Sequence, residues 1–180
     1  MINYKVKKSE ILFRGKVFDL QVDEIEYDSG NKGIREVAVH PGGAVVVPVK
    51  DDDKIVMVNQ FRYPFQKFLL ELPAGKLDKN EKPIDCAVRE LEEETGYKAK
   101  EIIELGSICT TPGYSTEVLY IFLAKDLVTG IYNREEGEHG MEVFEFTLEE
   151  IDRKILAGEI VDSKSICGIQ LFRLHKKSLY

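Results

Sequence analysis

The chain has 180 residues, of which 43% are hydrophobic and 32% are charged, and its formal net charge is -7. This length and composition predict a soluble globular domain with room for a short appended element, and no apolar run reaches the length of a membrane helix. Because no basic run or stripe occurs, we expect neither nucleic acid nor a membrane as a partner, whereas an anionic substrate bridged by a divalent cation is compatible with the acidic charge.

The first part of the chain shows strand patterns. Residues 11–27 alternate in part between apolar and polar side chains, and the turn cluster at 28–33 predicts a hairpin. The run AVVVPV at 44–49 is apolar throughout, which is typical of a strand covered on both faces. A polar turn at 51–54 precedes a strand at 55–63, which we expect to pair with the strand before it.

The period becomes helical after Pro83, a residue that the first turn of a helix accepts. Gly96 suits a C-terminal cap, so a helix is predicted up to about Thr95. Apolar residues recur every three or four positions and define one face. These residues are Ile84, Ala87, Val88 and Leu91.

The remaining pattern predicts strands at 101–109, 117–124 and 142–147, and helices at 148–157 and 163–177. Strands, a helix, further strands and further helices in this order predict an α/β sandwich with a mixed sheet. We expect residues 41–180 to form this domain. Residues 1–40 are expected to form an N-terminal antiparallel extension that packs on the domain or on a second subunit.

The cysteines Cys86, Cys109 and Cys167 form no CxxC pair. An odd number at this wide spacing predicts neither a disulfide framework nor a zinc site. We therefore expect reduced, buried thiols in a cytoplasmic protein. The N-terminal sequence MINYKVKKSE lacks the apolar segment of a signal peptide.

The segment VRELEEETG, residues 88–96, places four glutamates within five positions of the predicted helix. Like charges three or four residues apart on a helix repel by about 0.2–0.5 kcal/mol per pair. At 100° per residue, Glu90, Glu93 and Glu94 share an arc that is separate from the apolar face. This arc is either a solvated acidic face or a site for Mg²⁺ or Mn²⁺, which prefer carboxylate oxygens.

The residues around these glutamates favour the cation site. From Gly75 to Tyr97 the chain follows the spacing G-x5-E-x7-R-E-U-x-E-E-x-G-U, which resembles the Nudix box of the Nudix hydrolases. Tyr97 departs from the usual aliphatic residue at the last position. The other matching positions are Gly75, Glu81, Arg89, Glu90, Leu91, Glu93, Glu94 and Gly96. The resemblance implies an α/β/α sandwich in which the box forms a loop, a helix and a loop.

The same resemblance implies roles for residues of the box. Glu90 and Glu94 would be the main ligands of Mg²⁺, for which Mn²⁺ would substitute, and the Ala74 carbonyl would be a further ligand. Glu93 would rank closely behind them as a ligand, and Arg89 would orient a glutamate through a salt bridge.

Residues 60–81 resemble the ADP-ribose pyrophosphatases of this family over their whole length, and TTPGYSTE at 110–117 resembles their S-P-G-F-x-x-E segment. This implies metal-dependent hydrolysis of the diphosphate in ADP-ribose to AMP and ribose 5-phosphate. The implied substrate-binding residues are Arg35, Glu36, Arg62, Thr111, Pro112, Gly113 and Glu117. For Arg35 and Arg62, a surface salt bridge is the alternative.

The general base is implied to lie in the loop at 133–143, which holds Glu135, Glu136, Glu138 and Glu142. We favour Glu138, with Glu136 next, although the loop length leaves the register open.

The resemblance also implies a homodimer in which the N-terminal sheet of one subunit reaches the adenosine site of the other. Phe18 or Tyr27 would then contact the base, or would only pack in the core. The alternatives for the function are hydrolysis of another nucleoside diphosphate derivative, such as a sugar or a dinucleotide, and a non-catalytic module that senses a nucleotide. The retained carboxylates favour an enzyme.

Overall fold

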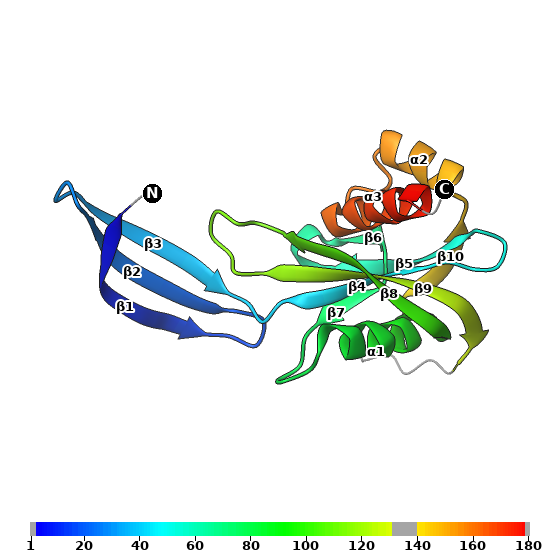
Figure 1. Ribbon diagram of the computed structural model, residues 1–180, viewed down its shortest axis with the longest axis horizontal. Helices are drawn as coiled ribbons and strands as arrows, with labels where there is room; N and C mark the ends of the chain where they lie inside the picture. Colours follow the sequence, from blue (N-terminus) through cyan, green and yellow to red (C-terminus); the bar gives the residue numbers. More distant parts are fainter. Residues whose placement is uncertain (1–2, 131–139, 179–180) are drawn as a thin grey trace. The chain divides into compact units, whose positions relative to one another are not determined.

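The structure is a computed structural model that describes residues 3–130 and 140–178. The chain divides into two compact units, which Figure 1 shows with their elements labelled. The first unit combines Met1–Gly42 with Cys109–Val118, and the second combines Gly43–Ile108 with Leu119–Tyr180. A domain boundary at residue 40 stays a prediction, and the sequence did not indicate that a later segment joins the N-terminal part.

The first unit is built on a three-stranded sheet in the order β1-β2-β3. Its strands are β1 (Tyr4–Arg14), β2 (Asp19–Tyr27) and β3 (Lys32–Val39), and both pairings are antiparallel. The turn between β2 and β3 passes through Gly30 at a φ of 85°, a conformation that glycine adopts without strain. The predicted hairpin and the antiparallel N-terminal extension are therefore confirmed.

The segment at 109–118 is tied to the end of β3 by backbone hydrogen bonds. The Ala38 N–H donates to the Tyr114 carbonyl at 2.7 Å, and the Thr116 N–H donates to the Ala38 carbonyl at 3.0 Å. Ala38 and Ser115 also form a parallel bridge. The first unit is therefore built from two stretches that lie far apart in the sequence.

The second unit contains two sheets, in the orders β10-β5-β6 and β7-β4-β9-β8. The parallel pair β4–β9 and the antiparallel pair β4–β7 make the second sheet mixed, as predicted. The strands are β4 (Gly43–Pro48), β5 (Ile55–Arg62), β6 (Lys67–Glu71), β7 (Ala74–Lys76), β8 (Tyr97–Cys109), β9 (Val118–Thr129) and β10 (Glu142–Phe146). The helical elements are η1 (Tyr63–Phe65), α1 (Pro83–Thr95), α2 (Leu148–Leu156) and α3 (Ser163–Ser178).

The predicted pairing of β5 with the strand before it was wrong. Apart from a single bridge between Val49 and Ile55, β5 pairs with β6 and β10, whereas β4 pairs with β7 and β9. The short polar turn between β4 and β5 suggested a hairpin. β6 directly follows β5 in the chain, whereas β7, β9 and β10 lie further along it, and a local pattern cannot indicate such pairings.

The helices cover both faces of β4, with α1 on one side and α2 and α3 on the other (Figure 1). Val45 and Val47 belong to the core cluster that includes residues of α2 and α3, whereas Ala44 and Val46 belong to the cluster that includes residues of α1. All residues of β4 are buried. The expected α/β/α sandwich is thus present, and its two cores explain the uninterrupted apolar run.

Buried polar contacts join the start of α3 to the end of β6. The Leu72 N–H donates to Ser165 Oγ at 2.7 Å, and the Ser165 hydroxyl donates to Asp162 at 2.5 Å. The buried carboxylate of Glu71 accepts from Lys164. These contacts hold the segment that leads into β7.

Of the three cysteines, which are all free, only Cys86 is buried. Cys109 is exposed and Cys167 is partly buried, so the expectation of three buried thiols was wrong for two of them. No helix in the described parts of the chain is long and apolar enough to span a membrane.

We predict that Ser165→Ala lowers the free energy of unfolding by about 1–3 kcal/mol, because the buried Leu72 N–H loses its acceptor. Urea denaturation measures this change. Ser163→Ala, at an exposed position two residues earlier, is the control and should stay within about 0.5 kcal/mol of the wild type. Equal stability of the two variants would contradict the role of the Ser165 hydroxyl.

Candidate active site

Helix α1 carries the cluster of glutamates and begins and ends as the sequence predicts. Pro83 stands in its first turn, and Gly96 forms the C-cap at a φ of 70°, donating its N–H to the Glu92 carbonyl. A left-handed C-cap of this kind favours glycine. Helix α1 therefore ends at Thr95, one residue after the last of these glutamates.

The predicted apolar face of α1 is only half correct. Ala87 and Leu91 are buried, but Ile84 and Val88 are 42% and 47% exposed. The carboxylates of Glu90 and Glu94 lie on the buried face instead, with exposures of 6% and 1%. Since a helix buries a single contiguous face, placing these two glutamates inside turns Ile84 and Val88 toward solvent.

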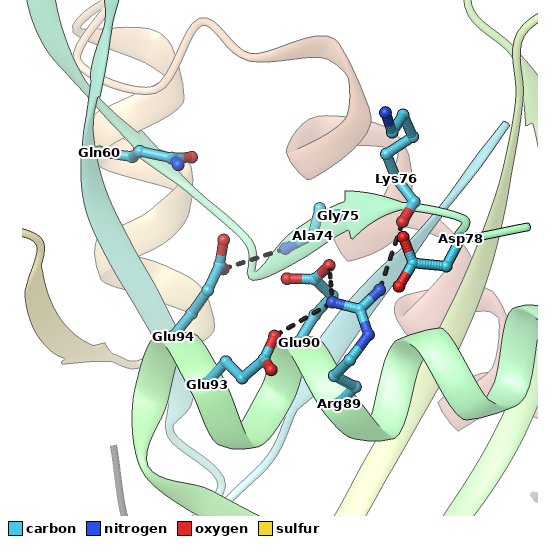
Figure 2. Close-up of a pocket in the computed structure, with 9 residues that line it drawn as sticks. All are labelled: Gln60, Ala74, Gly75, Lys76, Asp78, Arg89, Glu90, Glu93 and Glu94. Carbon is cyan, nitrogen blue, oxygen red and sulfur yellow. Dashed lines mark hydrogen bonds and ion pairs between the residues drawn. The ribbon is translucent and has the colours of Figure 1, made fainter. Parts of the chain in front are cut away.

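The glutamates open onto a pocket of about 300 Å³ within the second unit (Figure 2). It is lined by residues of β5, of β7 and the residues after it, and of α1. Five of the lining residues were predicted from the sequence: Ala74, Arg89, Glu90, Glu93 and Glu94. Four others also line it: Gln60, Gly75, Lys76 and Asp78. Among these four, only Gly75 was singled out in the sequence, as part of the box.

Arg89 forms ion pairs with three carboxylates in and beside the pocket. Its Nη1 donates to Glu90 at 2.6 Å and to Glu93 at 3.0 Å. Its Nε and Nη2 donate to the two oxygens of Glu81 at 2.9 and 3.0 Å. Arg89 therefore binds three carboxylates at once, which offsets their mutual repulsion on and beside α1.

This arrangement shifts the ionisation of its members. The hydrogen bonds from Arg89 lower the pKa of Glu81 to about 2, while the same contact raises the pKa of Arg89 above its usual value. Burial raises the pKa of the Cys86 thiol to about 12, and the adjacent Glu90 carboxylate adds to this shift. Cys86 is thus a protonated packing residue and not a nucleophile.

The carboxylate of Glu90 lies directly against Gly75. A Cβ atom at this position would lie 1.6 Å from Glu90 Oε1, so a side chain here would have to displace the Glu90 carboxylate. The neighbouring Ala74 N–H donates to Glu94 at 3.1 Å. The strand β7 thus passes directly over α1 and fixes two of its carboxylates.

The donor chemistry of the pocket suits a hard divalent cation, because its acidic lining consists of carboxylate oxygens. Among the described residues, however, no three acidic, histidine or cysteine side chains are already grouped closely enough to hold one ion. Glu90 and Glu93 contact Arg89, and Glu94 contacts the Ala74 amide. A cation would therefore require these oxygens to converge on it.

Arg62 also belongs to the second unit, where both oxygens of Glu71 accept from its guanidinium at 2.8 and 2.5 Å. Glu71 is buried, so this pair is partly structural and not the simple surface salt bridge that the sequence left open. These hydrogen bonds raise the pKa of Arg62, to which the nearby charges of Glu94 and Asp162 contribute. Arg62 and Glu94 therefore interact electrostatically.

Three predicted substrate residues come together in the first unit. Arg35, Glu36 and Gly113 line a pocket of about 570 Å³, to which Phe18 and Leu20 also contribute. Arg35 donates to Tyr27 and to the Ile34 carbonyl. The side chain of Phe18 is exposed in this pocket rather than packed in a core.

The other predicted residues of the first unit belong to the turn at 110–117. Thr111 accepts backbone hydrogen bonds from Tyr114 and Ser115, and Pro112 is exposed beside it. Glu117 accepts from the Thr110 hydroxyl at 2.6 Å and lies 3.4 Å from His40 Nδ1. Glu117 is thus held inside its own turn.

The favoured general base, Glu138, lies outside the described residues, as do Glu135 and Glu136. Glu142 is described and is exposed in β10, opposite Asn59 of β5.

The comparisons with known proteins agree with this geometry. The model of the NUDIX domain matches residues 39–166. An ADP-ribose pyrophosphatase of Bacillus subtilis (strain 168) is 41% identical over 171 residues, which are 94% of this chain and 92% of that protein. A methanol dehydrogenase activator of Bacillus methanolicus is 39% identical over 96% of this chain and 94% of its own length.

Among solved structures, the crystal structure of an ADP compounds hydrolase matches with a TM-score of 0.87. The match covers 98% of this chain and 95% of that one, at 19% identity. At this identity the likeness supports the fold alone.

We predict that Gly75→Ala lowers the affinity for Mn²⁺ by about 10–100-fold, the range found when a contact that orients a metal ligand is lost. The reason is that the new Cβ must displace the Glu90 carboxylate. Isothermal titration with Mn²⁺ measures the change. Gly113→Ala is the control, because a Cβ there meets no atom within 4 Å. Wild-type Mn²⁺ affinity in Gly75→Ala would exclude Glu90 as a ligand.

Proposed function

Because the chain belongs to the Nudix domain family, we propose that this Nudix hydrolase cleaves the diphosphate of ADP-ribose to AMP and ribose 5-phosphate, with Mg²⁺ as its cofactor and Mn²⁺ as a substitute. One observation carries the proposal: a helix buries two glutamates beside an arginine that binds three carboxylates. Burying charged groups costs free energy, and charged groups kept buried beside a pocket cluster at functional sites.

The carboxylates of Glu90 and Glu94 and the Ala74 carbonyl are the proposed metal ligands, and Glu93 acts beside them. A bound divalent cation would polarise the diphosphate and lower the pKa of a water molecule. Arg89 holds Glu90 and Glu93 in place through its guanidinium. Since this guanidinium already binds three carboxylates, we assign it an orienting role and not a contact with substrate.

The proposed substrate-binding residues are Arg62 in the second unit and Arg35, Glu36, Thr111, Pro112, Gly113 and Glu117 in the first. Arg62 supplies positive charge near Glu94. The pocket with Arg35, Glu36 and Gly113 has apolar walls at Phe18 and Leu20, which suit the nucleoside part of the substrate. Thr111, Pro112 and Glu117 are assigned to the same substrate.

A glutamate among residues 133–143 takes the proton from the attacking water in this proposal. We favour Glu138, with Glu136 and Glu142 as alternatives. We also propose a cytoplasmic location, which three free cysteines favour.

Initial rates with ADP-ribose, GDP-mannose and NADH, each with Mg²⁺ and with Mn²⁺, test the proposed substrate. ADP-ribose should give the highest kcat/KM. A higher value for one of the others would assign the enzyme to another nucleoside diphosphate derivative. Binding without turnover of any of the three would identify a sensing module.

We predict that Glu94→Gln lowers kcat by about 10²-fold or more, because loss of a metal ligand removes several kcal/mol of charge stabilisation. The fold should survive, since an amide of the same shape replaces a carboxylate among like charges. Glu92→Gln is the control: Glu92 pairs with Lys98 at 2.9 Å and does not line the pocket. If Glu94→Gln turned over like the wild type at saturating Mg²⁺, the metal assignment would be wrong.

The first unit supports a homodimer. Its sheet and the turn between β1 and β2 leave several large apolar side chains exposed, which a second copy of the chain would cover in this proposal. These side chains are Tyr4, Val6, Leu12, Phe13, Val17 and Ile34.

We predict that light scattering at micromolar concentration gives twice the chain mass of 20.5 kDa. Leu12→Glu should shift the protein toward the monomer, because it replaces an exposed apolar side chain of β1 with a charge. Ser9→Glu adds the same charge at an exposed polar position of β1 and should leave the mass unchanged. A monomer mass for the wild type would contradict the proposed homodimer.

A further inference from the structure

Along one face of β5, buried apolar side chains are followed by polar side chains. Side chains two residues apart on a strand point to the same side, so Val56, Val58, Gln60 and Arg62 share a face. Val56 and Val58 are buried and apolar. Gln60 is half-buried and lines the carboxylate pocket. An amide therefore stands where the apolar pattern reaches the pocket.

The side-chain amide of Gln60 makes no hydrogen bond with residues 3–130 or 140–178. Its partner across the sheet on β6 is Leu69, which offers no polar side-chain atom. The next residue on its face, Arg62, is bound to Glu71. The polar atoms of Gln60 are not among the buried side-chain atoms that lack a partner, so the amide faces the open pocket and can bind a group that enters it. Figure 2 shows it extending from β5 toward the centre of the pocket, above Glu94.

Gln60 differs from the glutamates and the arginine that line the pocket in the hydrogen bonds it can give. Glu90, Glu93 and Glu94 only accept when ionised. Arg89 donates from Nε, Nη1 and Nη2 to carboxylates of the protein itself. A neutral NH₂ group can donate to an anionic substrate without forming an ion pair with these carboxylates or repelling a cation.

We propose that Gln60 is a substrate-contacting residue whose Nε2–H donates to a non-bridging phosphate oxygen of the diphosphate in the carboxylate pocket. This inference rests on the proposed diphosphate hydrolysis and adds to it a contact that the spacing of the box does not include. Because the donor stands across the pocket from α1, the diphosphate is held between β5 and the glutamates. Gln60 thereby limits how the diphosphate can turn relative to Glu94.

Two variants distinguish whether Gln60 acts as a hydrogen-bond donor to the substrate or as a metal ligand. Gln60→Met keeps the length of the side chain and removes both the donor and the acceptor. Gln60→Glu keeps the shape, removes the donor and adds an oxygen ligand. Gln170→Met, on an exposed position of α3, is the control. Titration calorimetry with the methylene-bridged analogue of ADP in Mg²⁺ measures binding without turnover, and Mn²⁺ titration measures metal binding alone.

Losing a hydrogen bond to a charged group lowers affinity by about 10–100-fold. Gln60→Met should therefore weaken analogue binding and lower kcat/KM by this factor. Its Mn²⁺ affinity should stay at the wild-type value, and its Tm should equal or exceed that of the wild type. Gln60→Glu should bind the analogue at least as weakly as Gln60→Met. Gln170→Met should match the wild type throughout.

Two results would overturn the inference. One is wild-type analogue binding by Gln60→Met, which would show that the Gln60 amide donates no hydrogen bond to the diphosphate. The other is tighter Mn²⁺ binding by Gln60→Glu together with weaker Mn²⁺ binding by Gln60→Met, which would make Gln60 a metal ligand. Failure of the proposed function is recognised separately, because the wild type would then turn over none of the diphosphates tested. If the wild type prefers another diphosphate, the variants are compared on that one.

Discussion

The bonding of one guanidinium to three carboxylates is the interaction on which the site depends. Four glutamates within five residues would repel along α1, and burying two of them adds a desolvation cost. Arg89 offsets this cost by binding Glu90 and Glu93 of its own helix and Glu81 from the preceding turn. The low pKa of Glu81 reports the same contact from the other side. The helix can therefore keep a concentrated negative charge in a folded state.

A second constraint is the close passage of β7 over this helix. Gly75 has no room for a side chain because the Glu90 carboxylate occupies the space where a Cβ would lie. The strand is placed there by its pairing with β4, which in turn is buried between two cores. The start of α3 adds hydrogen bonds to Leu72 and Glu71 just before β7. Packing far from the carboxylates thus decides how closely Ala74 and Gly75 approach them.

Much of the fold followed from local patterns. The ends of α1, the buried strand β4 and the hairpin of the N-terminal extension were predictable because caps, apolar runs and turn residues act over a few neighbours. The pairing of β5 with the distant strand β10 was not, because strand pairing depends on which strands meet in the folded core. The exposure of Ile84 and Val88 was missed for a related reason: a hydrophobic pattern cannot show that two glutamates will displace apolar residues from the buried face.

The sequence by itself determined which side chains form the carboxylate cluster, because the box spacing alone brings Glu81, Arg89, Glu90, Glu93 and Glu94 onto one helix and the turn before it. Only the tertiary structure decided what faces that cluster. Gln60 and Asp78 join it through strand and loop positions that carry no spacing signal, and residues 109–118 join the N-terminal sheet from across the chain. The physical reason is that helix geometry is repeated every few residues, whereas contacts between elements depend on how the whole core packs.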